Sequence, residues 1–554
     1  MTNVCEADLF GTKRSPREIC PLELERYCPP QLVVSGSGDE RQVLESLRRY
    51  SNRPSYVHKT FHHLFQLTHG YERPRIDIIE LVVECSMKYQ SVFGIQMAAT
   101  ACLFNLSKET NSQKLHPKVL SKIVNVDLDA MEGFPQHQQL QKNVLLTLCN
   151  DRILQDVKFD KYRCARLVMD CLCTWPDPAM NRMSVAICSI LAAKITTKET
   201  SKLGSTAKYM KKLLQIVRTK TDAGIDLNNN EWVTMKFTLS ALWNLTDESP
   251  NTCRVFLDEG GMELFLRVIQ TYPSKIEIET KVLGLLNNIA EVKDLRSYIM
   301  DSRLIQELRK LMKSAKIEVS YFAAGIVAHL ASDDSEAWNL ASIPKTEITN
   351  ELKSIVSQWE TPDSEMVAYR SFTPFFPLMA VNQEYSVQLW AVWAIHHVCT
   401  KNPKRYLPML VYQEGIKVIA TLVDAKVEGA VYDMCQEVLD IVVKECVLSK
   451  SVLLALQKEI ERERLSNEWH REDTKNRPTN FVGGFHSDSS KSTNSKTDSN
   501  LERRTNKCIS DSDAGQGNES SSDESDSSNE TSIENTDSRD NDIPMQQHND
   551  LDSE

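Results

Sequence analysis

Two short segments of the chain combine an indole ring, side-chain amides and carboxylates at helical spacing. The first contains Trp243, Asn244 and Asp247, and the second contains Asn288 and Glu291. Residues three and four positions apart lie on one face of a helix, so each segment presents its polar groups together. If the two helices are neighbours, an aromatic wall stands beside two carboxylates and two amides, and this set could bind a cation.

Such a set of groups admits several interpretations. In an enzyme, Asp247 and Glu291 would be a general acid and base, but no nucleophile–base motif or phosphate-binding loop accompanies them. We therefore expect no catalytic residue, metal or cofactor. A protonated protein N-terminus, with a reference pKa of about 7.7–8 and three N–H donors, matches these acceptors better. The other alternative is that Asp247 and Glu248 are solvated charges at a helix end near Pro250.

The elements that position these residues are repeats. A pattern of an aliphatic residue, any residue, a polar residue and a second aliphatic residue recurs along the chain. Its polar residue falls at positions 105, 147, 189, 244, 288, 329 and 397, at intervals of 42, 42, 55, 44, 41 and 68 residues. Four intervals match the roughly 40–47 residues of HEAT and armadillo repeats. The two long intervals contain insertions, at Thr219–Glu231 and Ser332–Tyr385.

The residues around the pattern predict helices that pack closely. Small residues stand where a third helix of each repeat would meet its neighbour, and Gly260-Gly261 stands where one helix should stop and another begin. These small residues are Ala241, Gly284, Ala324 and Gly325. We expect an all-α, armadillo/HEAT-like helical repeat superhelix over residues 40–463, since stacked repeats bury a continuous core.

The final helix of each repeat commonly lines the concave side of such a superhelix, so the recurring polar residues would form a file along it. Asn105, Asn244, Asn288 and His329 belong to this file. A single Asn could equally brace the adjacent turn, whereas the whole file favours the binding of an extended peptide.

Composition restricts the class and location of the protein. The net charge of −11 is concentrated after residue 464, where Ser, Asp and Asn dominate; this composition predicts a disordered acidic tail over 464–554. Residues 1–39 are expected to be irregular. The chain has no basic stripe for nucleic acid, no apolar run that would span a membrane and no secretory signal. Its 15 scattered Cys residues favour a reducing compartment, the cytoplasm or nucleus.

Several long strings resemble one family. FTLSALWNLTDESPNTCRVF (Phe237–Phe256), KVLGLLNNIAEV (Lys281–Val292), EMVAYRSFTPFFPL (Glu365–Leu378) and VQLWAVWAIHHVC (Val387–Cys399) are similar to the Zyg-eleven and Zer-one family, and closer to its Zyg-eleven branch. The resemblance covers residues from about Glu40 to about Val447. It implies an armadillo domain that acts as a non-catalytic substrate receptor of cullin-two RING ubiquitin ligases.

The resemblance also implies a ligand. The family recognises proteins with an exposed N-terminal glycine, a glycine N-degron, through a Trp-Asn-x-x-Asp element and an Asn-x-x-Glu element. These elements match Trp243, Asn244 and Asp247, and Asn288 and Glu291. In such a site the indole would leave room for a glycine hydrogen but not for a larger first side chain.

The family's recruiting region departs from this pattern. Members carry an elongin-binding box and leucine-rich repeats before the armadillo domain, and these implied contacts to cullin-two and elongin B/C have no clear counterpart here. Leu24–Leu32 has the spacing of the box, but Pro29-Pro30 would break its helix. The alternatives are an armadillo adaptor or scaffold without ligase recruitment and, less favoured, an importin-alpha-like transport adaptor with Trp and Asn on several consecutive repeats.

Overall fold

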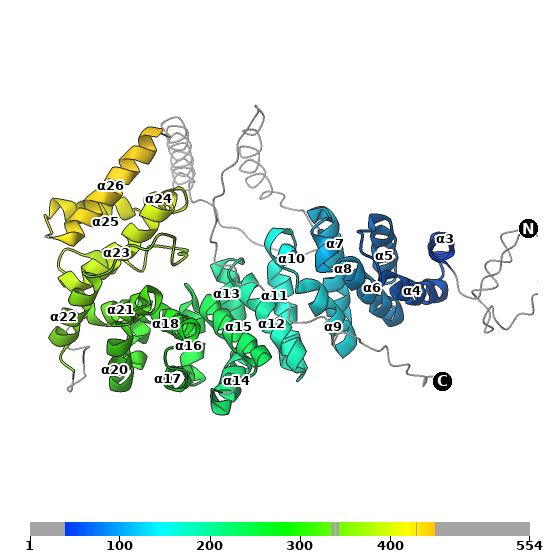
Figure 1. Ribbon diagram of the computed structural model, residues 1–554, viewed down its shortest axis with the longest axis horizontal. Coiled ribbons are helices and arrows are strands. Elements are labelled where there is room, and N and C mark those ends of the chain that lie inside the picture. The colour runs from blue at the N-terminus through cyan, green and yellow to red at the C-terminus, as the bar shows by residue number, and fades with distance from the viewer. Residues whose placement is uncertain (1–38, 226, 334–337, 339–342, 428, 449–554) are drawn as a thin grey trace, which may run out of the picture. The chain divides into compact units, whose positions relative to one another are not determined.

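The computed structural model describes residues 39–225, 227–333, 338, 343–427 and 429–448, and among these the regular structure is entirely helical (Figure 1). The predicted irregular segment before residue 39, the Leu24–Leu32 match and the predicted acidic tail lie outside the described residues. Among the described residues, those up to Leu439 form one compact unit, and residues 440–448 belong to a second unit.

The helices follow one another with short connections. They are α3 (Glu40–Tyr50), α4 (Pro54–Thr68), α5 (Ile76–Lys88), α6 (Phe93–Leu106), α7 (Glu109–Ser112), α8 (Pro117–Gly133), α9 (Gln138–Leu148), α10 (Asp151–Asp156), α11 (Lys161–Thr174), α12 (Pro178–Ala192), α13 (Thr197–Gly204), α14 (Ala207–Ala223), α15 (Asn229–Thr246), α16 (Pro250–Asp258), α17 (Gly261–Thr271), α18 (Ile276–Glu291), α19 (Arg296–Ile299), α20 (Ser302–Leu311), α21 (Ile317–Ala331), α22 (Lys345–Val356), α23 (Tyr385–Lys401), α24 (Pro403–Tyr412), α25 (Gly415–Asp424) and α26 (Ala430–Leu448), with 3-10 turns η2 (Lys293–Leu295) and η3 (Phe376–Met379).

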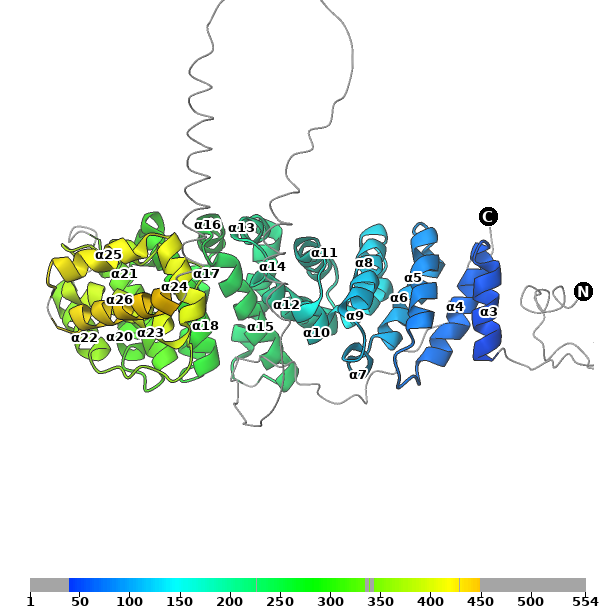
Figure 2. The same cartoon turned by 90° about the horizontal axis from the view of Figure 1, so that it is seen from above.

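The recurring sequence pattern marks one set of helices. Its seven polar residues lie on α6, α9, α12, α15, α18, α21 and α23, and each of these helices packs against the next (Figure 2). We call this set the inner row. The aliphatic residues that flank these polar positions are buried, as Leu242 and Leu245 are on α15, and the exception is Ile190 on α12, which is partly exposed. The predicted all-α repeat fold is therefore confirmed, since each helix buries its apolar face only by packing against neighbouring repeats.

Glycine residues lie at a helix boundary and at close helix contacts, at the positions that the sequence predicts. Gly260 has φ +76°, a left-handed conformation that favours glycine, and it separates α16 from α17. Gly284 on α18 and Gly325 on α21 lie directly against tryptophan rings of the adjacent inner helix. The expectation that small residues mark close helix contacts is thus confirmed.

The two insertions take different forms. Thr219–Ala223 forms the last turns of α14, and Asn229–Glu231 opens α15, where Asn228 accepts a hydrogen bond from the backbone of Glu231 in a capping box. The first insertion is therefore mostly additional helix. The second contains α22 and then a non-helical segment over 357–375, so it can carry side chains well away from its own repeat.

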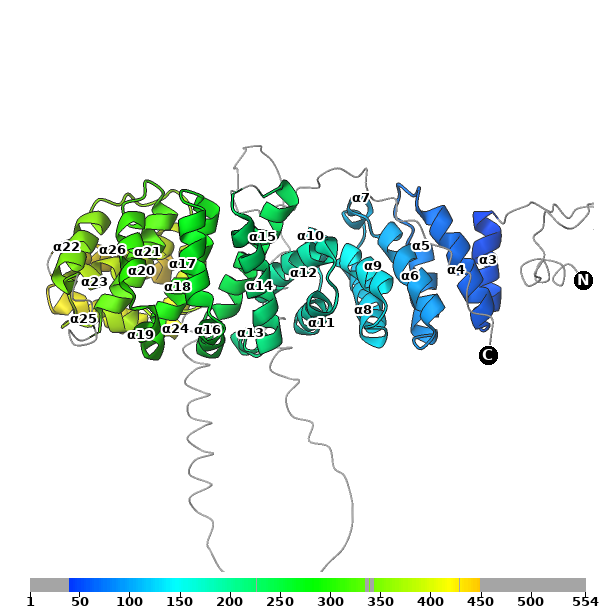
Figure 3. The same ribbon diagram turned by 90° about the horizontal axis from the view of Figure 1, so that it is seen from below.

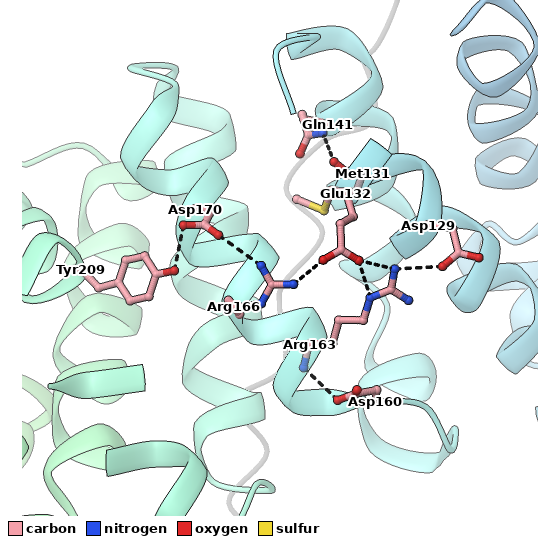
Figure 4. Close-up of polar contacts among 9 residues, drawn as sticks. All are labelled: Asp129, Met131, Glu132, Gln141, Asp160, Arg163, Arg166, Asp170 and Tyr209. Carbon is pink, nitrogen blue, oxygen red and sulfur yellow. Dashed lines mark hydrogen bonds and ion pairs between the residues drawn. The ribbon is translucent and has the colours of Figure 1, made fainter. Parts of the chain in front are cut away.

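Outer helices of successive repeats are joined by charged side chains (Figures 3 and 4). Arg163 on α11 contacts Asp129 at 2.9 Å and Glu132 at 2.5 Å, both on α8. Further along α11, Asp170 accepts a hydrogen bond of 2.8 Å from the Tyr209 hydroxyl on α14. The order of α8, α11 and α14 along the chain is followed in space. Each partly exposed pair contributes little alone, and together these contacts link three successive repeats.

Candidate functional site

The end of α15 positions Trp243, Asn244 and Asp247. Asp247 is the C-cap residue, with extended backbone at φ −60° and ψ 122°. Glu248 follows at φ +50°, an uncommon conformation for a residue with a side chain. Ser249 then caps α16. The chain therefore turns sharply directly after Asp247, and the Asp247 side chain is left 29% exposed.

The amides of the inner row brace neighbouring helices. Asn244 Nδ2 donates to the Ser189 carbonyl on α12 at 2.9 Å. Asn288 Nδ2 donates to the Trp243 carbonyl at 3.2 Å and to the Thr246 hydroxyl at 3.1 Å, both on α15. Asn105, in the first of these repeats, makes the same kind of contact to α4. These amide N–H groups hold each helix against the preceding one. The parts of the amides that can still bind a ligand are therefore chiefly their oxygen atoms.

The Trp243 indole forms an apolar wall across two helices. It lies on Gly284 of α18 and meets Phe322 of α21 edge to face, with the ring centroids 5.2 Å apart. The indole itself is only partly buried. Trp243 therefore contacts both of the helices that follow α15 in the inner row.

Replacing Gly284 with Ala should displace this wall. A Cβ atom at position 284 would lie 2.4 Å from Cε2 of Trp243, a separation that real side chains do not show. We expect Gly284→Ala to lower the free energy of unfolding by about 1–3 kcal/mol, as overpacking commonly does. Urea unfolding followed by circular dichroism measures this change.

A matched glycine serves as the control for that substitution. A Cβ at Gly133, the last residue of α8, would meet nothing within 4 Å. Gly133→Ala should leave stability unchanged or raise it slightly, because alanine restricts the unfolded chain. Equal unfolding curves for the two variants would contradict the proposed packing of Trp243.

Asp247 already has a cationic partner. Arg370, from the second insertion, places Nε 2.9 Å from Asp247 Oδ2. Burial raises the pKa of Asp247 to about 6, although the Arg370 charge opposes this rise and the Glu248 charge adds to it. At neutral pH Asp247 is therefore mainly ionised, and one of its oxygens is engaged by the guanidinium.

Glu291 is the more perturbed carboxyl group. It ends α18 and accepts a hydrogen bond of 2.9 Å from Asn287 Nδ2. Burial raises the pKa of Glu291 to about 8, and the charges of Asp247 and Glu248 raise it further than Arg296 and the Asn287 hydrogen bond lower it. A negative charge raises the pKa of a neighbouring carboxyl group only at short range, so the effect of Asp247 on Glu291 indicates that the two groups lie near one another. We call Asp247, Glu248 and Glu291 the carboxylate cluster.

The structure brings the predicted residues together and adds others. Trp243, Asp247 and Glu291 share one region of the inner row, whereas Asn244 and Asn288 support it from between the helices. Sequence reasoning missed Arg370 and Asn287 as members. The string around Arg370 was among those that carry the family resemblance, but nothing in its spacing indicated that it would reach α15.

The site supplies hydrogen-bond acceptors and negative charge. Among the described residues it is not accompanied by a metal-ligand set or by an importin-like series of exposed tryptophans. In the described part of the chain, no group of three or more His, Cys, Asp or Glu side chains could hold a metal ion. Within the same residues, no helix has both the length and the apolar composition of a membrane span. The tryptophans Trp390 and Trp393 on α23 are 0% and 5% exposed, so they are packing residues and do not extend an importin-like series.

Comparisons with known proteins identify the sequence group. Residues 84–444 match the family described as "Protein zer-1 homolog-like, C-terminal domain". The mouse "Protein zer-1 homolog" is 30% identical over 400 residues, which cover 71% of this chain and 50% of that protein. "Zyg eleven-related protein 1" of Caenorhabditis elegans is 29% identical over 401 residues, covering 71% and 44%. This chain thus spans about half the length of these curated relatives.

The solved structures similar to this chain are distant. The crystal structure of an engineered protein aligns with 72% of this chain and 98% of its own length, at 15% identity and a TM-score of 0.40. A likeness this low supports no statement about function, so the assignment depends on the sequence relatives and on the site itself.

Proposed function

Because this chain belongs to the zer-1 homolog family, we propose that it is a non-catalytic substrate receptor that binds the free N-terminal glycine of target proteins. The observation that carries the proposal is the carboxylate cluster beside the Trp243 indole. A buried carboxyl group that shifts toward its neutral form, as Glu291 does, lacks a cationic partner. A protonated N-terminal amine would supply that partner.

The chemistry of the cluster fits an amine in particular. An α-ammonium group offers three N–H donors, and the cluster and its amide neighbours offer oxygen acceptors. Charge-assisted hydrogen bonds of this kind are worth about 1.5–3 kcal/mol each. The close wall of Trp243 and Phe322 favours a first residue without a side chain. Glycine is that residue.

The ligase partners belong to the same proposal. The family resemblance implies that the receptor delivers its substrates to a cullin-two RING ubiquitin ligase through elongin B/C, in the cytoplasm or nucleus. Co-purification of the full chain with elongin B/C and cullin-two tests this part separately from peptide binding. The residues resembling the elongin box, Leu24–Leu32, lie outside the described part of the chain.

A peptide pair tests the central claim. We expect a peptide with a free N-terminal Gly to bind the full-length chain, and the same peptide with an acetylated Gly to bind at least about tenfold more weakly. Acetylation removes the positive charge and two of the three N–H donors, and it adds a group toward Trp243. Isothermal titration calorimetry measures both affinities. Equal affinities would exclude an amine site, and binding of a basic internal peptide instead would favour the transport-adaptor alternative.

A further inference from the structure

A segment of the second insertion crosses the inner row at the carboxylate cluster. We call residues Glu365–Met379 the strap. Its Tyr369 contacts the Tyr321 hydroxyl on α21, and its Phe375 stacks on Trp390 of α23 with centroids 5.4 Å apart. Its Arg370 reaches α12 and α15. The strap therefore contacts inner helices on both sides of α18, and the charge of Glu291 raises the pKa of Tyr369 on the strap.

Arg370 is the most extensively bound residue at this crossing. Its Nη2 donates to the Ala192 carbonyl at 2.7 Å, and its Nη1 lies 3.5 Å from the Ile195 carbonyl, 178 and 175 residues earlier in the chain. These carbonyls are at the C-terminal end of α12, where positive charge is favoured. The Nε atom contacts Asp247 Oδ2 at 2.9 Å. All three nitrogens of the guanidinium therefore have acceptors.

Glu291 is in a different situation. No ion pair to Glu291 is present among the described residues, and its hydrogen-bond donor is the neutral Asn287 amide. Arg296, whose charge lowers the pKa of Glu291, is itself paired with Asp333 at 2.6 Å. The other titratable groups coupled to the two carboxyls are Glu248 beside Asp247, Cys253 on α16, Tyr321 on α21 and Tyr369 on the strap.

We propose that Arg370 is a positioning residue of the amine site, which holds Asp247 ionised and oriented and leaves Glu291 as the carboxyl group that pairs with the incoming amine. This inference rests on the proposed function. It assigns different roles to Asp247 and Glu291, which the sequence alone does not distinguish. When the amine binds, the Glu291 carboxyl proton passes to the solvent, and the carboxylate so formed pairs with the ammonium. Asp247 needs no such step, because Arg370 already balances its charge.

Arg370→Met should therefore change the proton balance of binding. An adjacent guanidinium makes a carboxyl group at least about tenfold easier to ionise. Its loss should therefore raise the pKa of Asp247 well above its present value of about 6. Asp247 is then mostly protonated at pH 6.5 and must also lose its proton. We expect about half a proton more to be released per peptide at pH 6.5, and affinity about three- to tenfold lower there but nearly unchanged at pH 8.

Calorimetry of the full-length chain with a Gly-initiated peptide, in two buffers of different ionisation enthalpy, measures the protons released. Arg370→Lys keeps the charge and should restore the wild-type proton count. Arg303→Met, at an exposed arginine of α20 paired with Glu263 and Asp301, is the matched control. If Arg370→Met weakens binding equally at both pH values with an unchanged proton count, Arg370 only holds the strap and the inference is wrong. If the wild type binds no such peptide, the proposed function fails first, and this inference fails with it.

Discussion

A chain carrying Glu291→Gln should bind a Gly-initiated peptide about thirtyfold or more weakly than the wild type at pH 8. The substitution keeps the size of the side chain and its contact with Asn287, but it removes the negative charge that would pair with the amine. Loss of one partner from a desolvated charge pair commonly costs about 2–5 kcal/mol of binding free energy, and 2 kcal/mol is about thirtyfold in Kd. Calorimetry at pH 8 gives the two affinities.

The pH dependence of binding should change in the same variant. The pKa of Glu291 is raised to about 8, so the wild-type affinity should fall about tenfold for each pH unit well below 8, as Glu291 becomes harder to ionise. Above about pH 8 the peptide amine loses its proton, so affinity falls again. In Glu291→Gln the acidic limb should largely disappear, since the residue with the highest pKa no longer titrates.

The stability of the variant distinguishes lost binding from lost folding. A carboxyl group whose folded-state pKa is raised stabilises the fold below its unfolded pKa and loses that contribution as pH rises through about 8. Glutamine has no such loss, so Glu291→Gln should be at least as stable as the wild type at pH 8. Glu277→Gln, on an exposed turn of the same helix, should bind normally. A Glu291→Gln chain that binds as tightly as the wild type would remove Glu291 from the site.

The fold was predictable because each repeat contains the same local sequence pattern. Each inner helix carries a polar residue between aliphatic neighbours, and four of the six intervals are close to the repeat length. The burial of nearly all these neighbours follows from the pattern. Gly260 and Gly284 were predictable for the same reason, because the conformational or steric demand acts on one residue. Such signals need no knowledge of distant segments.

The site was predictable only in part, because its remaining members come from distant positions. Trp243 and Asp247 are one helical turn apart, so their proximity follows from the helix itself. Arg370 lies more than a hundred residues further along, after an insertion without a repeat pattern, and only the fold brings it to Asp247. The roles of Asn244 and Asn288 were left open by the sequence, since an amide can brace a helix or bind a ligand with the same spacing.

The second large expected effect concerns the stability of the fold and depends on the buried ion pair of Arg296 with Asp333. Arg296 is 8% exposed and opens α19, the short helix that follows α18 and η2, and its Nε donates to the Ala290 carbonyl on α18 at 2.7 Å. Its Nη1 donates to the Ser332 hydroxyl at 3.0 Å and contacts Asp333 at 2.6 Å, so it ties the end of α18 to the end of α21. Its Nη2 faces the buried ring of His329 at 3.5 Å. No other described cation pairs with Asp333.

Replacing Arg296 with Met should lower the free energy of unfolding by about 3 kcal/mol, as breaking a buried ion pair commonly does. Urea unfolding at pH 7 measures this change. The loss comes from the charge left at Asp333 and the acceptors left at Ala290 and Ser332, so Arg296→Met with Asp333→Asn should recover part of it. Arg303→Met, whose side chain is 55% exposed, should cost less than about 1 kcal/mol.

The same variant connects stability to binding. The positive charge of Arg296 lowers the pKa of Glu291 against the effect of burial, so its removal should raise that pKa above about 8. Peptide binding by Arg296→Met should then require a higher pH than binding by the wild type, because Glu291 must lose its proton before it pairs with the amine. Arg296 would have this effect although it touches no ligand. A variant that loses stability but keeps the wild-type pH profile would show that Arg296 serves only the packing of α18 against α21.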